Sequence, residues 1–292
     1  MSKAGGSLRG LAFFKPDRVT MKTACFQKTA RTSHPFLPVM LLCLAFIILP
    51  VAAAGQELGG AVLLEGGTFL MGNNGTDNHS APAHEVELSP FSMDSHEVTA
   101  SEFARFLDDV GALSLDGHLL ANLGVSNVEV KNGKFSPAKG MAEYPAVGVT
   151  WYGAAAYAEW AEKELPTEAQ WEYAARGELE GKAFPWGDEF DTLRSNLAGS
   201  FTGPTPVMSY IPNGFGLFDM AGNAMEWTRD RYGMEYYIRS PKKDPKGPIR
   251  GDERVARGGA WDSSEAITVY DRLPLPPETA RSDLGFRCVM EE

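Results

Sequence analysis

The chain has 292 residues, and its 43% hydrophobic and 22% charged side chains are ordinary for a folded globular protein, so wholesale disorder is excluded. Asp and Glu outnumber Lys and Arg by 38 to 27, which gives a formal net charge of −11. Residues 1–54 are themselves basic, so the remainder is still more acidic. Such a surface does not suit nucleic acid, whose phosphates need Lys and Arg, and no nucleic-acid partner is expected.

The N-terminal segment has the pattern of an export signal. An uncharged apolar run covers residues 36–54, follows several basic residues and ends in three alanines. A basic flank, an apolar core and small residues at the cleavage position are typical of a secretory signal. We therefore predict a signal peptide over residues 1–54 and an exported protein, periplasmic or extracellular. The alternative is an uncleaved N-terminal anchor, because a run of this length can span a bilayer. Met21 is an alternative start to Met1.

Cysteine is scarce beyond this segment. Cys25 and Cys43 lie in the predicted signal, so the mature chain would keep only Cys288. A single cysteine cannot form an intramolecular disulfide, even in an oxidising compartment. The surrounding residues 285–289 are mostly apolar and strand-like, which favours a buried hydrophobic role for Cys288 over a reactive thiol.

We predict that residues 55–292 form one α+β domain. Its first half shows the patterns of several strands followed by a helix. Strands are expected at 62–65, 67–72 and 84–88, where apolar residues alternate or run together between turn residues. A capping box of Thr99 and Glu102 begins a helix that extends to about Asp109. Further on, Asn132-Gly133 between two short strands indicates a type I′ hairpin turn.

Two more helices and a long irregular region complete the predicted domain. A short strand at 147–151 precedes a helix at 154–163, and Thr167 with Gln170 forms a second capping box for a helix that ends at Gly177. On this last helix we expect Glu168, Glu172 and Arg176 to form surface ion pairs. Little periodicity follows before residue 254. Such long loops must satisfy their backbone polar groups, and bound metal ions are one way to do so.

Several motifs, in one order along the chain, resemble those of formylglycine-generating enzymes, also called sulfatase-modifying factors. The longest are LPTEAQWEYAARG at 165–177 and NGFGLFDMAGNAMEW at 213–227. Shorter matches lie at 66–72, 97–99, 145–151, 185–187, 257–261 and 285–287. The resemblance covers essentially all of 60–292. It implies the family's fold, a loop-rich α+β domain related to C-type lectin-like folds and stabilised by calcium.

The resemblance does not extend to the family's copper site. The enzymes oxidise a cysteine of an unfolded sulfatase to formylglycine, with copper held by two cysteines shortly after a Gly-Gly-Ser-Trp-like motif. Here Gly258-Gly259-Ala260-Trp261 is followed by Ser263 at the first thiol position, and the second falls near Thr268. Cu(I) needs soft thiolates, and a hydroxyl is a hard, neutral donor. We therefore expect no copper and no formylglycine-generating activity.

By resemblance, the region between residues 196 and 226 holds the family's two structural Ca²⁺ sites. The second site would take two carboxylates and two backbone carbonyls, from Asp219, Glu226, Gly222 and Ala224. The alternative is that Asp219 caps a turn and Glu226 is solvated. The first site matches less well, because Asn196 and the Leu197 carbonyl are present but the closing carboxylate is replaced near Gly199. No histidine metal centre is expected, since the histidines lack ligand spacing.

Polar residues occupy the stretch that lines the cleft in the family, and we expect any ligand to bind there. These candidates are Asp262, Ser263, Tyr270, Asp271 and Arg272. Family membership alone does not settle activity, so three functions stay open. The first is a non-catalytic domain that binds a protein, peptide or glycan. The second is an enzyme of altered oxidative chemistry that matures an exported peptide or siderophore. The third is the variable protein of a diversity-generating retroelement.

Overall fold

The computed structural model describes residues 60–75, 79–114, 116–199 and 201–292. The predicted signal peptide, its cleavage position, Cys25 and Cys43 lie outside the described residues. Residues 55–292 form one compact unit. Within the described part no helix is long and apolar enough to cross a membrane.

In the part of the chain that the structure describes, the strands form two sheets and two two-stranded pairs. An antiparallel sheet has the order β1-β4-β11, with bounds Ala61–Leu64, Phe91–Asp94 and Val289–Glu291. The central sheet has the order β10-β7-β8-β9, with bounds Leu284–Gly285, Met225–Arg231, Arg254–Arg257 and Leu273–Leu275. The strand pairs are β2-β3 and β5-β6, with bounds Gly67–Met71, His84–Leu88, Val128–Lys131 and Lys134–Pro137. The predicted hairpin is confirmed, because Asn132 and Gly133 have φ of 53° and 79°.

Four helices are assigned in the described part: α1 (Ala100–Val110), α2 (Trp151–Trp160), α3 (Glu168–Arg176) and α4 (Tyr236–Arg239). Both predicted capping boxes are confirmed, at Thr99 and Thr167. The boundary predicted for the second helix is wrong by three residues. Thr150 accepts the N–H of Gly153 and caps α2, so the segment 147–151 is not a strand and its last residue is already helical.

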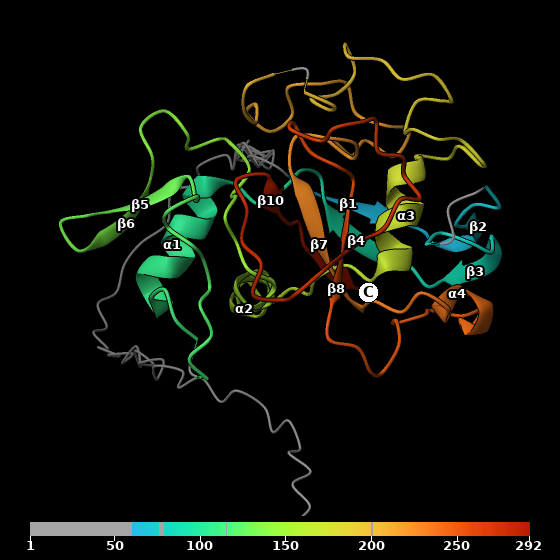
Figure 1. Ribbon diagram of the computed structural model, residues 1–292, viewed down its shortest axis with the longest axis horizontal. Helices are drawn as coiled ribbons and strands as arrows, with labels where there is room; N and C mark the ends of the chain where they lie inside the picture. The colour runs from blue at the N-terminus through green and yellow to red at the C-terminus, as the bar shows by residue number, and fades with distance from the viewer. Residues whose placement is uncertain (1–59, 76–78, 115, 200) are drawn as a thin grey trace, which may run out of the picture. The chain divides into compact units, whose positions relative to one another are not determined.

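Helices α1 and α2 lie on one side of the central sheet and α3 on the other (Figure 1), and the buried apolar residues form two clusters. One packs α1 and α2 against β7 and β10 around Phe103, Phe106 and Trp227. The other packs α3 against β2, β3 and β4 around Phe91, Met93 and Trp171. Cys288 is fully buried in the first part, where burial raises the pKa of its thiol well above the ordinary value. The buried hydrophobic role predicted for it is confirmed.

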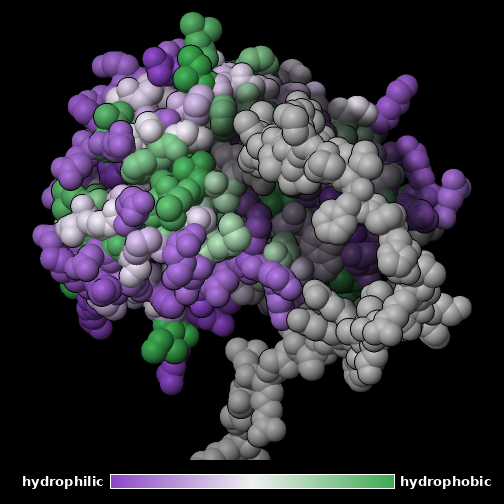
Figure 2. Space-filling model, turned by 180° about the vertical axis from the view of Figure 1, so that it is seen from behind, coloured by the Kyte–Doolittle hydropathy of each residue, from purple (hydrophilic) through white to green (hydrophobic). Residues whose placement is uncertain are grey.

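Among the described residues between α3 and β7 no helix or strand is assigned, in agreement with the lack of periodicity there. Up to residue 254 the same expectation is wrong, because β7 and α4 lie before that residue. Most of β7 is buried on both faces, so its sequence does not alternate. The exterior is mainly hydrophilic on the face in Figure 2, where apolar side chains form scattered patches. The combination of two packed cores with long ordered loops confirms the predicted loop-rich α+β class. The loops between α3 and β7 and between β8 and β9 carry most of the predicted site residues.

Candidate functional site

A cleft of about 770 Å³ opens beside the loop that joins β8 to β9. Among the predicted cleft residues, it is lined by Asp262, Ser263, Asp271 and Arg272. Tyr270 does not line it, because its ring packs against the second part of the core. The remaining lining residues include Glu265 and Arg281, which the sequence did not single out, and the apolar Ile267 and Leu273.

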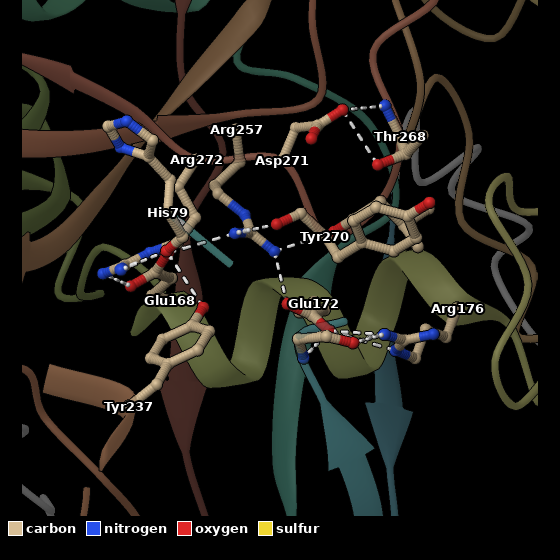
Figure 3. Close-up of polar contacts among 12 residues, drawn as sticks. His79, Glu168, Glu172, Arg176, Tyr237, Arg257, Thr268, Tyr270, Asp271 and Arg272 are labelled. Carbon is tan, nitrogen blue, oxygen red and sulfur yellow. Dashed lines mark hydrogen bonds and ion pairs between the residues drawn. The ribbon is translucent and has the colours of Figure 1, made fainter. Parts of the chain in front are cut away.

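A buried ionic network on α3 supports one wall of this cleft (Figure 3). Glu172 accepts hydrogen bonds from Arg257 at 2.6 Å and from Arg176 at 2.6 Å, and it also accepts the N–H of Gly72 at 2.8 Å. The predicted i,i+4 pairing is confirmed for Glu172 and Arg176, but its predicted surface location is wrong, since Glu168, Glu172 and Arg176 are all buried. The helix is packed on several faces, and its charged residues are retained there because each is paired.

Glu168 is the second centre of the network. It binds Arg257 at 3.0 Å and Arg272 through two hydrogen bonds of 2.6 and 2.9 Å. Burial raises the pKa of Glu168, but the guanidinium groups of Arg272 and Arg257 outweigh that effect and lower it below the ordinary value. Arg272 also lies over the rings of Tyr232 and Tyr237, 4.9 and 4.2 Å from their centroids. Arg272 therefore lines the cleft as a structural residue, with a side chain that is 0% exposed.

The same arginines fix the backbone of the cleft loop. Arg257 donates to the carbonyls of Val269 at 2.7 Å and Tyr270 at 3.3 Å. Asp271 accepts both the N–H and the hydroxyl of Thr268, at 2.7 and 2.8 Å. The segment 268–272 is thus held rigidly. By contrast, Asp262 and Glu265 are exposed on the other half of the loop.

The two positions that match the family's copper ligands are engaged within this loop. Ser263 Oγ accepts the N–H of Ala260 at 2.9 Å, and Thr268 Oγ1 donates to Asp271. The thiol of Cys288 is buried in the core and does not line the cleft. The donor set at these positions is therefore hydroxyl oxygen and does not fit Cu(I).

A second buried charge centre lies at the predicted calcium loop. Glu226 binds Arg287 through hydrogen bonds of 2.7 and 2.8 Å and accepts the indole N–H of Trp171 at 2.8 Å. Asp219 accepts the N–H of Met208 with one oxygen, while its Oδ1 is buried without a hydrogen-bond partner. Both oxygens of Glu97 are also buried without a partner. Glu97 is thus an acidic residue of this centre that the sequence analysis noted only as part of a motif.

The electrostatics of this centre favour a bound cation. Burial raises the pKa of Asp219 to about 6, and burial together with Asp219 raises the pKa of Glu97 well above its ordinary value. Arg287 opposes both shifts but is already paired with Glu226, and His96 also opposes the shift of Asp219. Carboxylate oxygens without partners are what a Ca²⁺ ion requires, so the residues present fit the group that the family implies. In the described residues, side chains of His, Cys, Asp and Glu do not by themselves form a metal-binding group, so backbone carbonyls would have to contribute.

The weaker of the two predicted calcium positions also has a buried oxygen without a hydrogen-bond partner. Asn196 is 0% exposed, and its amide N–H donates to the carbonyl of Gly203 at 2.9 Å. Its Oδ1 is buried without a hydrogen-bond partner. Leu197 is buried beside it, and Gly199, where the family's closing carboxylate is missing, donates its N–H to the Trp261 carbonyl. Asn196 Oδ1 is therefore a buried oxygen without a hydrogen-bond partner at this position.

A model of the sulfatase-modifying factor enzyme 1-like domain matches residues 49–292. The chain belongs to this family. The formylglycine-generating enzyme of Streptomyces coelicolor is 35% identical over 286 residues, which cover 81% of this chain and 91% of that protein. The family resemblance inferred from the motifs is confirmed.

Two other comparisons bear on how far the likeness extends. The serine/threonine-protein kinase pkn1 of Chlamydia caviae is 41% identical over 232 residues, and the match spans 78% of this chain but 37% of that protein. Among solved structures, PvdO from Pseudomonas aeruginosa superposes with a TM-score of 0.64 and 25% identity, covering 80% of this chain and 94% of that one. The family domain thus accounts for most of the described chain.

Proposed function

We propose that this protein is an exported ligand-binding domain on the scaffold of the formylglycine-generating enzymes, without their oxidase activity. Its ligand is a protein, peptide or glycan that binds in the cleft. The observation that carries the proposal is the combination of an open polar cleft with hydroxyl groups at both copper-ligand positions. By the resemblance, this cleft corresponds to the place where the family binds its substrate, and the two matching positions lack the thiolates that the oxidation requires.

Rigidity of the cleft wall supports a binding role. Arg257 and Arg272 are anchored by Glu168 and hold the backbone of the loop between residues 268 and 272. A wall that is ordered in advance lowers the entropic cost of binding, because fewer groups must be immobilised when the ligand arrives. Ser263, Glu265 and Asp262 line the same cleft with polar groups.

Calcium is proposed as a structural ion at the second charge centre. Asp219 and Glu97 would supply carboxylate oxygens, and Gly222 and Ala224 would supply backbone carbonyl oxygens. Glu226, which binds Arg287, would supply a further carboxylate oxygen. The ion would offset the repulsion between buried carboxylates and so stabilise the loop that leads into β7. Asn196 with the Leu197 carbonyl is proposed as the weaker second position.

The oxidase activity is tested with two proteins. The first is the native chain and the second carries Ser263→Cys and Thr268→Cys, which restores thiols at the matching positions. Each is incubated with Cu(I), oxygen and a peptide that carries the sulfatase cysteine motif. We expect no aldehyde product and no tight Cu(I) binding for the native chain, whereas the double variant binds Cu(I). Catalytic aldehyde formation by the native chain, detected by mass spectrometry, would overturn the proposal.

Ligand binding is tested with peptide and glycan arrays. Ala266 lines the cleft, so Ala266→Trp should fill it, whereas Glu180→Trp places the same side chain on an exposed site that does not line the cleft. We expect signals that the first variant abolishes and the second retains. If every signal persists in Ala266→Trp, the cleft is not the binding site.

A further inference from the structure

Two arginines lie directly opposite each other at one end of the central sheet. Arg231 of β7 and Arg254 of β8 are paired in the antiparallel register of these strands. Like charges that are directly opposite on an antiparallel pair destabilise it. Both residues are partly buried, so water screens their repulsion less than it does on an open surface. Neither lines the cleft beside the β8–β9 loop, so the pair is separate from the site described above.

Neither arginine has an acidic partner in the described part of the chain. The neighbouring Arg229 forms an ion pair with Glu164, but no described Asp or Glu forms one with Arg231 or Arg254. Instead, Arg254 Nη1 donates to the Arg229 carbonyl at 2.7 Å, and Arg231 Nη1 donates to the Gly251 carbonyl. A carbonyl oxygen satisfies a donor but carries no net charge. The two positive charges therefore lack a counter-ion, and further guanidinium N–H donors remain for a ligand.

The surroundings of Arg254 make its charge costly. Burial and, next, the charge of Arg231 lower the pKa of Arg254 below its ordinary value, to about 10. Tyr152 and Asp230 oppose this shift, but the Asp230 carboxylate is buried and accepts the backbone N–H of Glu168. Arg254 is still charged at neutral pH. An anion beside it would reduce the cost of keeping that charge in the folded protein.

Aromatic residues at the start of α2, which lies beside the central sheet, hold this region in place (Figure 1). Cζ of Arg254 lies 3.5 Å from the centroid of the Trp151 ring, and the Trp151 indole donates to the Thr228 carbonyl of β7 at 2.9 Å. His118 stacks on Tyr152 with ring centroids 3.8 Å apart. Stacking restricts the guanidinium plane, so less freedom is lost when a ligand binds.

Tyr152 adds a hydroxyl to the same place. Burial and Glu278 raise the pKa of Tyr152, whereas Arg254 and Arg231 oppose that rise, so the hydroxyl lies within electrostatic range of both arginines. Its hydrogen bond to Glu278 Oε1 is long, at 3.4 Å. Glu278 is exposed and forms no ion pair with either arginine within the described residues. The hydroxyl can therefore turn from Glu278 to an anion at the arginines.

We propose that Arg231 and Arg254 bind a doubly charged oxyanion group, a phosphate or a sulfate, with the Tyr152 hydroxyl as a third donor. Guanidinium groups present parallel N–H donors that match the oxygens of such a group. Two uncompensated positive charges suit a dianion, because it neutralises both. The site lies outside the cleft, so the inference goes beyond the proposed function and does not depend on it.

The experiment measures thermal unfolding of the full chain with sulfate as the probe. The native chain and Arg231→Gln are compared in sulfate and in chloride, at equal ionic strength and equal free Ca²⁺, so that screening and the calcium sites are matched. Sulfate at about ten times its Kd should raise the native midpoint about 3–6 °C more than chloride does. Arg231→Gln should lose most of this increment and keep only the general effect of sulfate on apolar burial.

Three further variants separate an anion site from a structural role. Arg105→Gln removes an exposed charge of α1 and should keep the whole increment. Arg231→Lys keeps the positive charge and should keep part of it. Glu278→Gln removes the acidic neighbour and should strengthen sulfate binding about two- to fivefold, as expected for one exposed charge pair. In chloride, Arg231→Gln should unfold no earlier than the native chain, because it relieves the repulsion on Arg254.

Vesicles distinguish a lipid headgroup from a soluble oxyanion. The native chain and Arg231→Gln are sedimented with phosphatidylcholine vesicles, with and without phosphatidic acid. Binding that requires phosphatidic acid and is lost in Arg231→Gln would assign the site to a lipid phosphate. A sulfate increment without vesicle binding would assign it to a soluble anion or ester.

Two results would overturn the inference. One is equal stabilisation of the native chain by sulfate and chloride, and the other is a full sulfate increment in Arg231→Gln. In the first case, a lower midpoint of Glu278→Gln in chloride would identify Glu278 as the counter-ion of the arginine pair.

Discussion

Arg287 binds both carboxylate oxygens of Glu226 in the interior, 61 positions away in sequence. It also donates to the carbonyls of Phe218 at 2.8 Å and Asp94 at 3.2 Å. Glu226 therefore anchors an arginine that ties the loop before β7 to β4. Glu226 is therefore paired with a buried cation, whereas Asp219 Oδ1 has no hydrogen-bond partner.

Calcium is expected to raise the stability of the protein through Asp219. Because the ion binds only the folded state, free Ca²⁺ at a hundred times its Kd adds about 2.7 kcal/mol to the free energy of unfolding. Asp219→Asn should remove most of this gain. The measurement is thermal unfolding of both proteins with excess Ca²⁺ and with a chelator.

Glu226→Gln serves as the contrasting variant. It should lower the unfolding midpoint in the chelator as well as in Ca²⁺, because it leaves Arg287 with an incomplete partner in the core. Glu97→Gln should behave like Asp219→Asn. Equal midpoints with and without Ca²⁺ for the native chain, once shown to be metal-free in the chelator, would contradict the calcium assignment.

Removing a charge from the buried network should be strongly destabilising. Glu172→Gln deprives Arg257 and Arg176 of a shared anion, and we expect a loss of about 3–5 kcal/mol in the free energy of unfolding. Urea unfolding measures the loss, and Glu180→Gln on the surface is the control. A change below about 1 kcal/mol for Glu172→Gln would show that the network is not needed to hold α3 against β8.

Asp230 should make the free energy of unfolding depend on pH, and one variant should remove that dependence. Burial and the neighbouring Glu168 raise its pKa from 3.8 to about 7. A raised carboxyl pKa stabilises the folded state fully below the unfolded pKa, and this contribution is lost as the pH rises from about 4 to 7. Asp230→Asn keeps an oxygen that can accept the Glu168 N–H without the charge.

The stability of Asp230→Asn relative to the native chain should therefore increase between pH 4 and pH 7, by on the order of 3 kcal/mol. Urea unfolding at several pH values provides the measurement. A constant difference across this range would show that Asp230 ionises normally in the folded protein.

Export is expected to remove the N-terminal segment. The apolar run and the alanines that follow it predict cleavage after Ala54, so protein recovered from the extracytoplasmic fraction should begin near Gly55. Edman sequencing of that protein identifies the first residue. A chain that remains in the membrane fraction with residues 36–54 intact would favour the anchor.

The sequence by itself determined the family, the fold class, two helix N-caps and a hairpin turn. Capping boxes at Thr99 and Thr167 and the Asn132-Gly133 turn depend on interactions between residues a few positions apart, so their patterns are visible in the chain. The absence of cysteine between residues 44 and 287, and so of thiols at both copper-ligand positions, is equally visible, because it depends on residue identity alone. These features required no knowledge of packing.

Only the tertiary structure decided which charged residues are buried and which partner each one has. The i,i+4 spacing of Glu168, Glu172 and Arg176 indicates a surface helix, but Arg257 and Arg272 approach from residues 85 and 104 positions away and pair with α3 in the core. Likewise, Glu97 shows no sign in sequence of facing Asp219. Whether a charge is solvated or paired depends on contacts between distant segments, and no local pattern encodes them.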